Sequence, residues 1–437
     1  MNVRNMTNTM LKQKAQRFYS TLYQCAKANP TRKFHALYDK IYRPDILKTA
    51  WLKVKANKGS AGIDGVTIDQ IVDEIGERVF LNELYKKLKT GTYRPTPVKR
   101  VWIPKPNSDK KRPLGIPTVE DRVVQQAVKF VIEPIFETTF KESSYGFRPN
   151  RSAHQAMKAI KKASRKAYWV VDIDIKGYFD NINHKKLMTL VGEKISDRRL
   201  LKLIESWLKC GVMEDGSLQT SELGSPQGGV ISPLLANIYL NLLDRIWEKR
   251  HQDLGVLVRY ADDMVILTKN KEDATKTIKI LNGIFHVLEI EMNQEKSRIV
   301  NIWDNKNGFD FLGFHNRKFP RKKKGGKTFY FLEQIPKKEA MKKMRSMFRE
   351  YIMPRNRLFW DTLDFIDDLN RKIRGLRNYY NISVLAPRWL RRIDWYIKQL
   401  LLMHYNKRRT NKNKRSNWKV VNKLLEGKLL KLAQVAP

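Results

Sequence analysis

The pattern of apolar and polar residues predicts a β-hairpin in Val256–Thr268, whose sequence is VLVRYADDMVILT. Apolar, β-prone runs lie on either side of a YADD segment, whose acids are Asp262 and Asp263. Valine, isoleucine and tyrosine favour strands and adjacent acids favour turns, so the two carboxylates are expected near the hairpin tip. Neighbouring carboxylates repel one another, and burying them is costly unless a cation neutralises them. The two interpretations at this stage are a solvated turn and a site for a divalent cation.

A second acidic strand is predicted in Trp169–Asp180, WVVDIDIKGYFD. Asp172 and Asp174 lie on one face of this strand, because side chains two positions apart point the same way. The spacing alone does not choose between them. Either one, together with the two acids of the hairpin, would supply three carboxylates from two strands. Such a set can hold two divalent ions on the reacting oxygens of an in-line phosphoryl transfer.

Two further hairpins are predicted, and the first of them carries basic residues on both arms. The segments 98–103 and 112–116 are β-prone and are separated by the turn-forming sequence PNSD. In this hairpin Lys105 and Arg112 could meet a triphosphate, the arginine through two parallel hydrogen bonds. A solvated basic hairpin is the alternative. A similar pattern predicts another hairpin in Gly211–Leu223.

Helical spacing of apolar residues marks several further segments. Glu120–Phe140 keeps the 3.6-residue period, and Pro134 should kink or end this helix. Asn183–Leu208 is predicted to be helical with a central turn, and Ala274–Leu288 to be an amphipathic helix that leads to a strand at 297–303. This alternation of strands and helices predicts an α+β domain.

A glycine-rich loop, GSPQGG, precedes one predicted helix. Gly228 and its neighbour allow the backbone to approach a ligand closely, and Gln227 offers a donor and an acceptor beside them. Ser232 should cap the following helix, with Pro233 in its first turn. A plain glycine-rich entry into a helix is the alternative.

From about Ile335 the pattern becomes helical. One apolar face comprises Phe365, Ile366, Leu369, Ile373, Leu376 and Tyr380, and another comprises Trp389, Leu390, Ile393, Ile397, Leu400 and Leu401. Basic residues lie on or near the second face: Arg388, Arg391, Arg392, Lys398, Lys407, Arg408 and Arg409. Basic helices with a buried face suit binding to a nucleic-acid backbone, and solvated basic helices are the alternative. Arg148 and Arg151, in the segment SYGFRPNRS, are further candidates for backbone contacts.

The composition favours a polyanionic partner. The 437 residues carry 86 Lys and Arg against 44 Asp and Glu, for a net charge of +42. Of this charge, +24 lies between Arg317 and Pro437. Such a field attracts nucleic acid and makes binding strongly salt-dependent. A membrane partner is not expected, because no run of about 18 apolar residues occurs.

Cysteine usage and the first residues bear on the compartment. Only Cys25 and Cys210 are present, so neither a disulfide framework nor a zinc cluster is predicted. Met1–Arg17 is polar and lacks the apolar core of a signal peptide. A reducing cytoplasm is therefore the expected compartment.

Four sequence blocks together resemble one known family, the reverse transcriptases encoded by bacterial group II introns. The blocks are DIKGYFD at 174–180, GSPQGGVISP at 224–233, YADD at 260–263 and FLGF at 311–314. Their order and approximate spacing also match, and the resemblance runs over about residues 57–409. It implies a right-hand polymerase with fingers and palm, made of antiparallel sheet plus helices, followed by an α-helical thumb or maturase domain.

The resemblance also implies domain limits. They are an N-terminal helical extension at 1–56, the fingers and palm at 57–320, the thumb at 321–409 and a short basic tail at 410–437. The HNH endonuclease of the family needs Cys pairs and His residues beyond this point. Residues 410–437 contain neither, so DNA cleavage is not expected of this chain. The segment GLRNYY departs from the family's usual G-W-x-N-Y-F in having Leu376 where Trp is common.

The activity that the resemblance implies is RNA-directed DNA synthesis with two Mg²⁺ ions. The expected partners are template and intron RNA, a DNA primer or target, and deoxynucleoside triphosphates. The implied catalytic residues are Asp174, Asp262, Asp263 and Lys296, with Ile175 added at the metal site. The lysine corresponds to one thought to protonate the leaving pyrophosphate.

The resemblance assigns binding roles as well. The implied nucleotide-binding residues are Lys105, Arg112, Phe179, Gln227 and Gly228, and Phe179 matches the position that excludes a ribose 2′-hydroxyl. The expected nucleic-acid contacts are Arg148, Arg151, Arg388, Arg391, Arg392, Lys407 and Arg408. Two other functions stay open: a maturase that acts mainly as an RNA-binding splicing factor, and a group II-like reverse transcriptase recruited to defence or repair.

Overall fold

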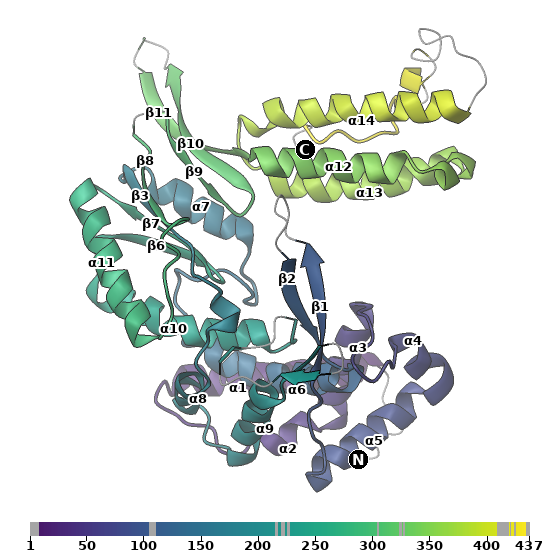
Figure 1. Ribbon diagram of the computed structural model, residues 1–437, viewed down its shortest axis with the longest axis vertical. Helices are drawn as coiled ribbons and strands as arrows, with labels where there is room; N and C mark the ends of the chain where they lie inside the picture. Colours follow the sequence, from purple (N-terminus) through teal and green to yellow (C-terminus); the bar gives the residue numbers. More distant parts are fainter. Residues whose placement is uncertain are drawn as a thin grey trace.

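The computed structural model describes residues 8–104, 111–214, 217–219, 223–224, 228–303, 306–322, 326, 328–408, 419, 421–423 and 425–433. Its elements form the fingers, palm and thumb of an α+β right hand (Figure 1). The predicted fold class is therefore confirmed. None of the helices in these ranges has the length and apolarity that a bilayer crossing requires.

A helical layer forms the base of the fingers. It comprises α1 (Asn8–Ala28), α2 (Tyr38–Ile41), α3 (Pro44–Ala56), α4 (Ile68–Gln70), a π-helix (Ile71–Ile75), α5 (Glu77–Thr90) and α6 (Val119–Glu137). α3 packs on both α1 and α6, and its Trp51 is fully buried with its ring 5.4 Å from that of Phe80 on α5. Pro134 lies inside α6, which continues to Glu137. Pro134 was expected to kink or end this helix, and the structure shows that it does not end it.

The fingers sheet has the order β2-β1-β4-β5. Its strands are β1 (Val98–Pro104), β2 (Lys111–Ile116), β4 (Val212–Glu214) and β5 (Ser217–Gln219). β1 and β2 pair antiparallel, as do β4 and β5, which confirms both predicted hairpins. The first two residues of β4 run parallel to β1, so the two hairpins form one sheet.

The palm sheet has the order β6-β7-β3-β8, with all pairs antiparallel. Its strands are β3 (Trp169–Ile173), β6 (Gly255–Tyr260), β7 (Asp263–Thr268) and β8 (Arg298–Asn301). One face packs on α10 (Ser232–Arg250) and α11 (Lys271–Val287), and the other on α7 (Ala153–Ala163). α8 (His184–Gly192) and α9 (Arg198–Lys209) extend the helical layer under the palm. The cap of α10 is Ile231 rather than Ser232, which already has helical geometry.

A three-stranded sheet with the order β11-β10-β9 joins the palm to the thumb. Its strands are β9 (Gly308–Phe311), β10 (Phe314–Lys322) and β11 (Thr328–Pro336). The FLGF segment is the turn between β9 and β10, with Leu312 at φ +49° and Gly313 at φ +83°. The two left-handed residues reverse the chain, so that β9 ends at Phe311 and β10 begins at Phe314. The expected domain limit at residue 320 falls inside β10.

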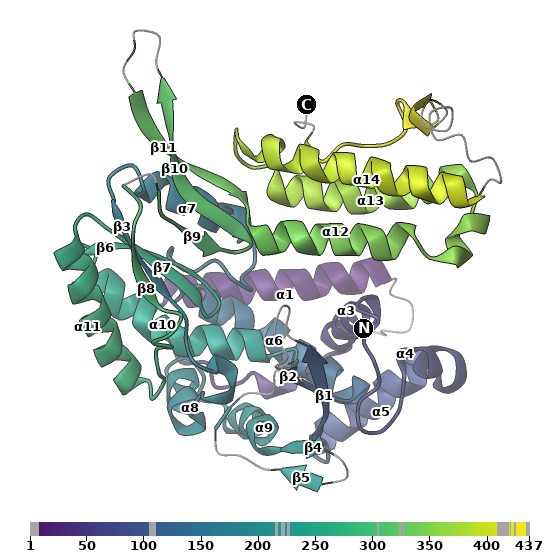
Figure 2. The same ribbon diagram turned by 45° about the horizontal axis from the view of Figure 1, so that its top comes forward.

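The thumb is a bundle with its own hydrophobic core. Its elements are α12 (Lys338–Ile352), a 3₁₀-helix (Arg355–Phe359), α13 (Thr362–Tyr380) and α14 (Ala386–Arg408). Its core includes the predicted apolar faces of α13 and α14, of which Leu369, Ile373, Leu390 and Ile393 have no exposure. Figure 2 shows the three long helices lying side by side, with α12 nearest the fingers.

Candidate active site and nucleic-acid interface

Strand register brings two of the predicted acids together. The pairing of β3 with β7 ends at Ile173 and Met264. Asp174 follows Ile173 and Asp263 precedes Met264, so each acid lies one residue beyond this last pair, at the same edge of the sheet. Asp262 belongs to the turn between β6 and β7 and precedes Asp263 directly. The sequence places three carboxylates at one edge because both strands end there.

The electrostatics of this acidic edge favour a bound cation. Lost hydration raises the pKa of Asp263 to about 6, and the charges of Asp262, Asp174 and Asp172 act in the same direction. Lost hydration also raises the pKa of Asp262, and the nearby Arg112 opposes that rise. Oxygen ligands that repel one another are the donor set that hard divalent ions such as Mg²⁺ neutralise.

Asp174 is held by three residues of the segment before β8. Its Oδ2 accepts hydrogen bonds from Asn293 Nδ2 at 3.0 Å and from Lys296 Nζ at 3.2 Å. Its backbone N–H donates to Ser297 Oγ at 3.1 Å. The structure therefore brings Lys296 into direct contact with the acidic edge. Lys296 is 66% exposed in its side chain, so a ligand in the cleft could also reach it.

Asp172 has a different partner. Its carboxylate accepts from Arg298 Nε at 3.3 Å across the β3–β8 pair. Asp172 also lies within the β3–β7 ladder, opposite Val265, whereas Asp174 lies beyond its last pair beside Asp263, so the register favours Asp174 of the two. No group of three or more His, Cys, Asp or Glu side chains in the described ranges is arranged as a preformed metal cluster. Asp174 instead points toward Asn293 and Lys296.

A buried ion pair supports the turn that carries Asp262. Arg259 and Asp244 have no exposure, and Arg259 Nε donates to Asp244 Oδ1 at 2.9 Å. Arg259 Nη1 also donates to the carbonyl of Ala261 at 2.8 Å, the turn residue with φ +59°. This network was not predicted from the sequence. The available signal was a charged residue inside the apolar run VLVRY.

The SYGF loop also contacts the acidic turn. Tyr145 N–H donates to the Arg259 carbonyl at 2.9 Å, and Arg259 N–H donates to the Ser143 carbonyl at 2.8 Å. Asn237 Nδ2 donates to the Gly146 carbonyl at 2.8 Å, while Asn237 Oδ1 accepts from Arg259. A Cβ at Gly146 would clash with the backbone of Ala261. This close approach requires glycine.

The structure describes three of the predicted nucleotide-binding residues, and one of them acts on the acidic edge. Arg112 of β2 is exposed and close enough to lower the pKa of Asp262. Phe179 is half-buried, with its ring 5.5 Å edge-on from that of Tyr178. Gly228 has φ +117°, and a Cβ there would clash with the carbonyl of Gly115 on β2. The predicted residues Lys105 and Gln227 lie outside the described residues.

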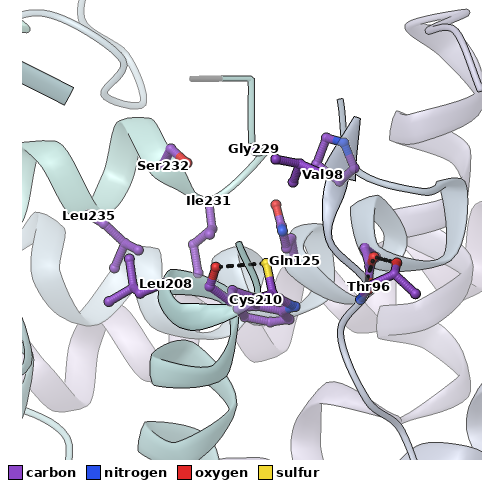
Figure 3. Close-up of a pocket in the computed structure, with 12 residues that line it drawn as sticks. Thr96, Val98, Gln125, Leu208, Cys210, Gly229, Ile231, Ser232 and Leu235 are labelled. Carbon is purple, nitrogen blue, oxygen red and sulfur yellow. Dashed lines mark hydrogen bonds between the residues drawn. The ribbon is translucent and has the colours of Figure 1, made fainter. Parts of the chain in front are cut away.

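A small cavity lies beneath the loop that leads into α10 (Figure 3). Its volume is about 10 Å³, roughly the space of one water molecule. Gln125 Oε1 accepts from Val230 N–H at 2.9 Å, which fixes the loop to α6. Cys210 donates to the Trp207 carbonyl at 3.1 Å, and burial raises the pKa of its thiol to about 11. These contacts indicate a structural cavity rather than a substrate site.

Arg148 and Arg151 are not equivalent. The Arg148 side chain is 3% exposed, pairs with Glu137 at 2.7 Å and donates to the carbonyls of Lys141 and Ser144. Arg148 was expected to contact a nucleic-acid backbone. The structure contradicts this expectation, because the guanidinium N–H groups of Arg148 already bind groups inside the protein. Arg151 is half-buried and pairs with the exposed Glu142 at 2.6 Å.

A basic groove runs between the three-stranded sheet and the thumb. It measures about 1020 Å³. Its basic lining residues are Arg298, Arg317, Lys338, Lys342, Arg345 and Arg392, against the acids Asp310 and Glu339. A neighbouring hollow of about 450 Å³ is lined by Arg345, Arg391, Arg392, Trp395 and Tyr396. The excess of cations suits a phosphate backbone.

The other predicted thumb residues lie on α14. Arg388, Arg391, Arg392 and Lys407 are exposed, as an interface requires. The side chain of Arg408 lies outside the described residues.

Two tyrosines at the end of α13 contact the FLGF turn. Tyr379 hydroxyl donates to the Leu312 carbonyl at 2.9 Å, and a Cβ at Gly313 would lie 3.1 Å from the Tyr380 hydroxyl oxygen. Both rings pack on Phe314, with centroids 5.4 and 5.3 Å away. Lys337 N–H donates to the Gly313 carbonyl at 3.1 Å. The thumb is therefore fixed to the palm beside the acidic edge.

This fold and site define a polymerase palm of the reverse transcriptase class. Residues 103–316 match the family described as reverse transcriptase (RNA-dependent DNA polymerase). Residues 341–422 match the group II intron, maturase-specific domain.

Similarity to individual proteins agrees with these matches. The chain is 30% identical over 443 residues to group II intron-encoded protein LtrA of Lactococcus lactis subsp. cremoris, covering 82% of this chain and 72% of LtrA. It is 33% identical over 330 residues to protein YkfC of Escherichia coli (strain K12), covering 66% of this chain and 84% of YkfC. The chain belongs to the group II intron-encoded reverse transcriptases and maturases, and it is an RNA-directed DNA polymerase.

Proposed function

We propose that Asp174, Asp262 and Asp263 hold two Mg²⁺ ions during cDNA synthesis on an RNA template. The ions would polarise the primer 3′-hydroxyl and neutralise the triphosphate. Ile175 would contribute only its backbone carbonyl, since its side chain is apolar and 6% exposed. The observation that carries this proposal is the register that ends β3 and β7 at the same edge, one residue before Asp174 and Asp263.

The proposal also assigns roles to three other residues: Arg112, Lys296 and Phe179. Arg112 binds the phosphates of the incoming nucleotide, because its charge already acts on Asp262. Lys296 gives a proton to the leaving pyrophosphate from its position 3.2 Å from Asp174 Oδ2. Phe179 excludes a ribose 2′-hydroxyl by its bulk. Replacing Phe179 with Ala should therefore let the enzyme incorporate ribonucleotides.

The test is a double variant, Asp262→Ala with Asp263→Ala. Primer extension on RNA should be abolished, while RNA affinity stays within about twofold of the parent. The matched control is Asp253→Ala, an exposed acid before β6, which should extend normally. Full extension by the double variant would refute the assignment.

We also propose that the thumb groove binds intron RNA and so assists splicing. The match to the maturase-specific domain and the cations of the groove support this second role. Arg345→Ala with Arg392→Ala should weaken splicing of the cognate intron, while the acidic double variant should splice normally. Splicing that tolerates loss of both arginines would contradict this role. If the DNA that flanks the gene encodes intron RNA domains, that would support the splicing role over recruitment to defence or repair.

A further inference from the structure

An exposed aromatic cluster lies at the end of the palm sheet opposite the acidic edge. Tyr168 precedes β3, Trp303 follows β8 and Tyr330 lies on β11. Asp174 is six residues further along β3 than Tyr168, roughly 20 Å at the rise of a strand. The three side chains are 36%, 54% and 41% exposed. Contiguous exposed rings of this size mark an interaction surface.

The rings have a fixed arrangement. Tyr168 and Trp303 meet edge to face with centroids 4.7 Å apart, and the ring of Tyr330 lies 6.3 Å from that of Trp303. The backbone beneath them is hydrogen-bonded: Tyr168 N–H donates to Thr268 at 3.0 Å, and Ile302 N–H donates to the Tyr168 carbonyl at 2.8 Å. A rigid aromatic surface loses little entropy when it binds a ligand.

A buried lysine lies behind the rings. Lys318 is 3% exposed, and its Nζ lies 4.7 Å from the ring centroid of Tyr168 and 5.0 Å from that of Trp303. Its Nζ donates a hydrogen bond to the Ala167 carbonyl at 3.4 Å, and no carboxylate of the described residues forms an ion pair with it. The ammonium charge is therefore shared with the rings rather than with a carboxylate. An aromatic surface with a cation behind it attracts anionic ligands.

The flanking sequence adds to this positive charge. Residues 161–168, which lead into β3, contain four Lys and Arg and no acid. Arg165 and Lys166 are exposed directly before the cluster. The β10–β11 hairpin that carries Lys318 and Tyr330 projects from the palm in both views (Figures 1 and 2). A ligand at the cluster would therefore meet aromatic rings and cations together.

We propose that Tyr168, Trp303 and Tyr330 form a stacking platform for single-stranded RNA outside the catalytic cleft. Bases stack on exposed rings whatever the sequence, and the cations bind the phosphates between them. Charge complementarity favours nucleic acid over an apolar protein partner. We choose RNA over DNA as the single strand, because newly made cDNA leaves the active site paired with its template and so is not single-stranded. The inference rests on the proposed function only for this choice of strand.

The test uses the full chain with its cleft saturated by a primer–template duplex. Affinity for a 12-nucleotide oligo(U) is measured by fluorescence anisotropy. The variant Trp303→Ala with Tyr330→Ala should bind about fivefold more weakly or worse, since stacking contributes about 1–3 kcal/mol per base. Trp303→Phe should restore part of the affinity. Val287→Ala, an exposed apolar residue at the end of α11, is the control and should bind normally.

Crosslinking gives an independent readout. Oligo(U) that contains 4-thiouridine should crosslink to peptides with Tyr168 or Trp303 in the parent chain. Unchanged affinity of the double variant, or crosslinks confined to the thumb, would overturn the proposal. Self-association of the parent that the double variant loses would also overturn it, in favour of contact between two copies. Extension of a prehybridised primer should stay normal in the variant, so this result is separate from the test of the acidic edge.

Discussion

Arg259 and Asp244 form an ion pair that is completely buried in the palm, and the same arginine holds the carbonyl of Ala261 at the acidic turn. Replacing Arg259 with Ala would leave the Asp244 carboxylate buried without a counter-charge. The free energy of unfolding should fall by about 3–5 kcal/mol. Primer extension should be lost with it, since the turn that carries Asp262 loses its support. Urea unfolding and an extension assay measure the two effects.

A compensated variant separates stability from positioning. Arg259→Met with Asp244→Leu removes both buried charges, and stability should return to within about 2 kcal/mol of the parent. Extension should stay at least about tenfold lower, since nothing then donates to Ala261. Arg245→Ala is the control, because Arg245 pairs with Glu193 at the surface and should cost about 1 kcal/mol or less. Normal extension by the compensated variant would show that the pair only stabilises the fold.

Gly228 makes a second sensitive contact, between the loop before α10 and the fingers hairpin. Gly228→Ala would place a methyl group against the Gly115 carbonyl and 3.0 Å from Leu114 Cδ1, at a backbone φ of +117°. Either the loop or β2 must move, so extension should fall by about tenfold to a hundredfold. Steady-state kinetics should show a raised KM for nucleotide. Gly192→Ala has open space around it and should behave as the parent.

The sequence predicted the elements whose patterns are local. The acidic strand, the palm hairpin and both fingers hairpins follow from alternation and turn residues within about fifteen positions. The approach of Asp174 to Asp263 depends instead on the long-range pairing of β3 with β7. Arg259 was missed because its partner Asp244 lies on a helix, and nothing in the strand pattern pairs the two. Arg148 looks like a surface arginine in its loop, but Glu137 in α6 buries it. The FLGF turn depends on a left-handed Leu312, which no propensity predicts.

The thumb cations should govern how RNA affinity depends on salt. Arg391→Ala with Arg392→Ala would remove two exposed guanidinium groups of α14. The slope of log affinity against log salt should become shallower by about 1 to 2 for a duplex. Titrations between 50 and 300 mM KCl measure it. Lys276→Ala with Lys279→Ala, exposed on α11, is the charge-matched control; an equal change there would mean that only net charge matters.

Glu77 at the start of α5 makes stability depend on pH. Burial raises its pKa, but hydrogen bonds from Lys48 and Lys55 outweigh this effect and hold the pKa at about 2. A carboxylate with a lowered pKa stabilises the fold above its unfolded value of about 4.5 and loses that contribution as pH falls toward 2. Glu77→Gln should therefore cost about 1 kcal/mol at pH 7, because water screens these partly exposed pairs.

The difference between Glu77→Gln and the parent should narrow below pH 4.5. Denaturant unfolding at pH 7, 5 and 3.5 measures it. Glu205→Gln, from an exposed pair with Lys209, should show almost no difference at any pH. A Glu77→Gln deficit that stays constant across this range would assign the effect to packing instead.

The tyrosines that hold the FLGF turn join two parts of the chain that match different families. Tyr379 belongs to the maturase-specific segment, while Leu312 belongs to the reverse transcriptase segment. A rotation of the helical bundle must therefore move the β9–β10 turn, and with it the strands that join the bundle to the palm. Variants intended to separate DNA synthesis from splicing are best sought on the outer surfaces of the palm and of the thumb. A substitution at the contact between Tyr379 and Leu312 would alter both parts of the chain at once.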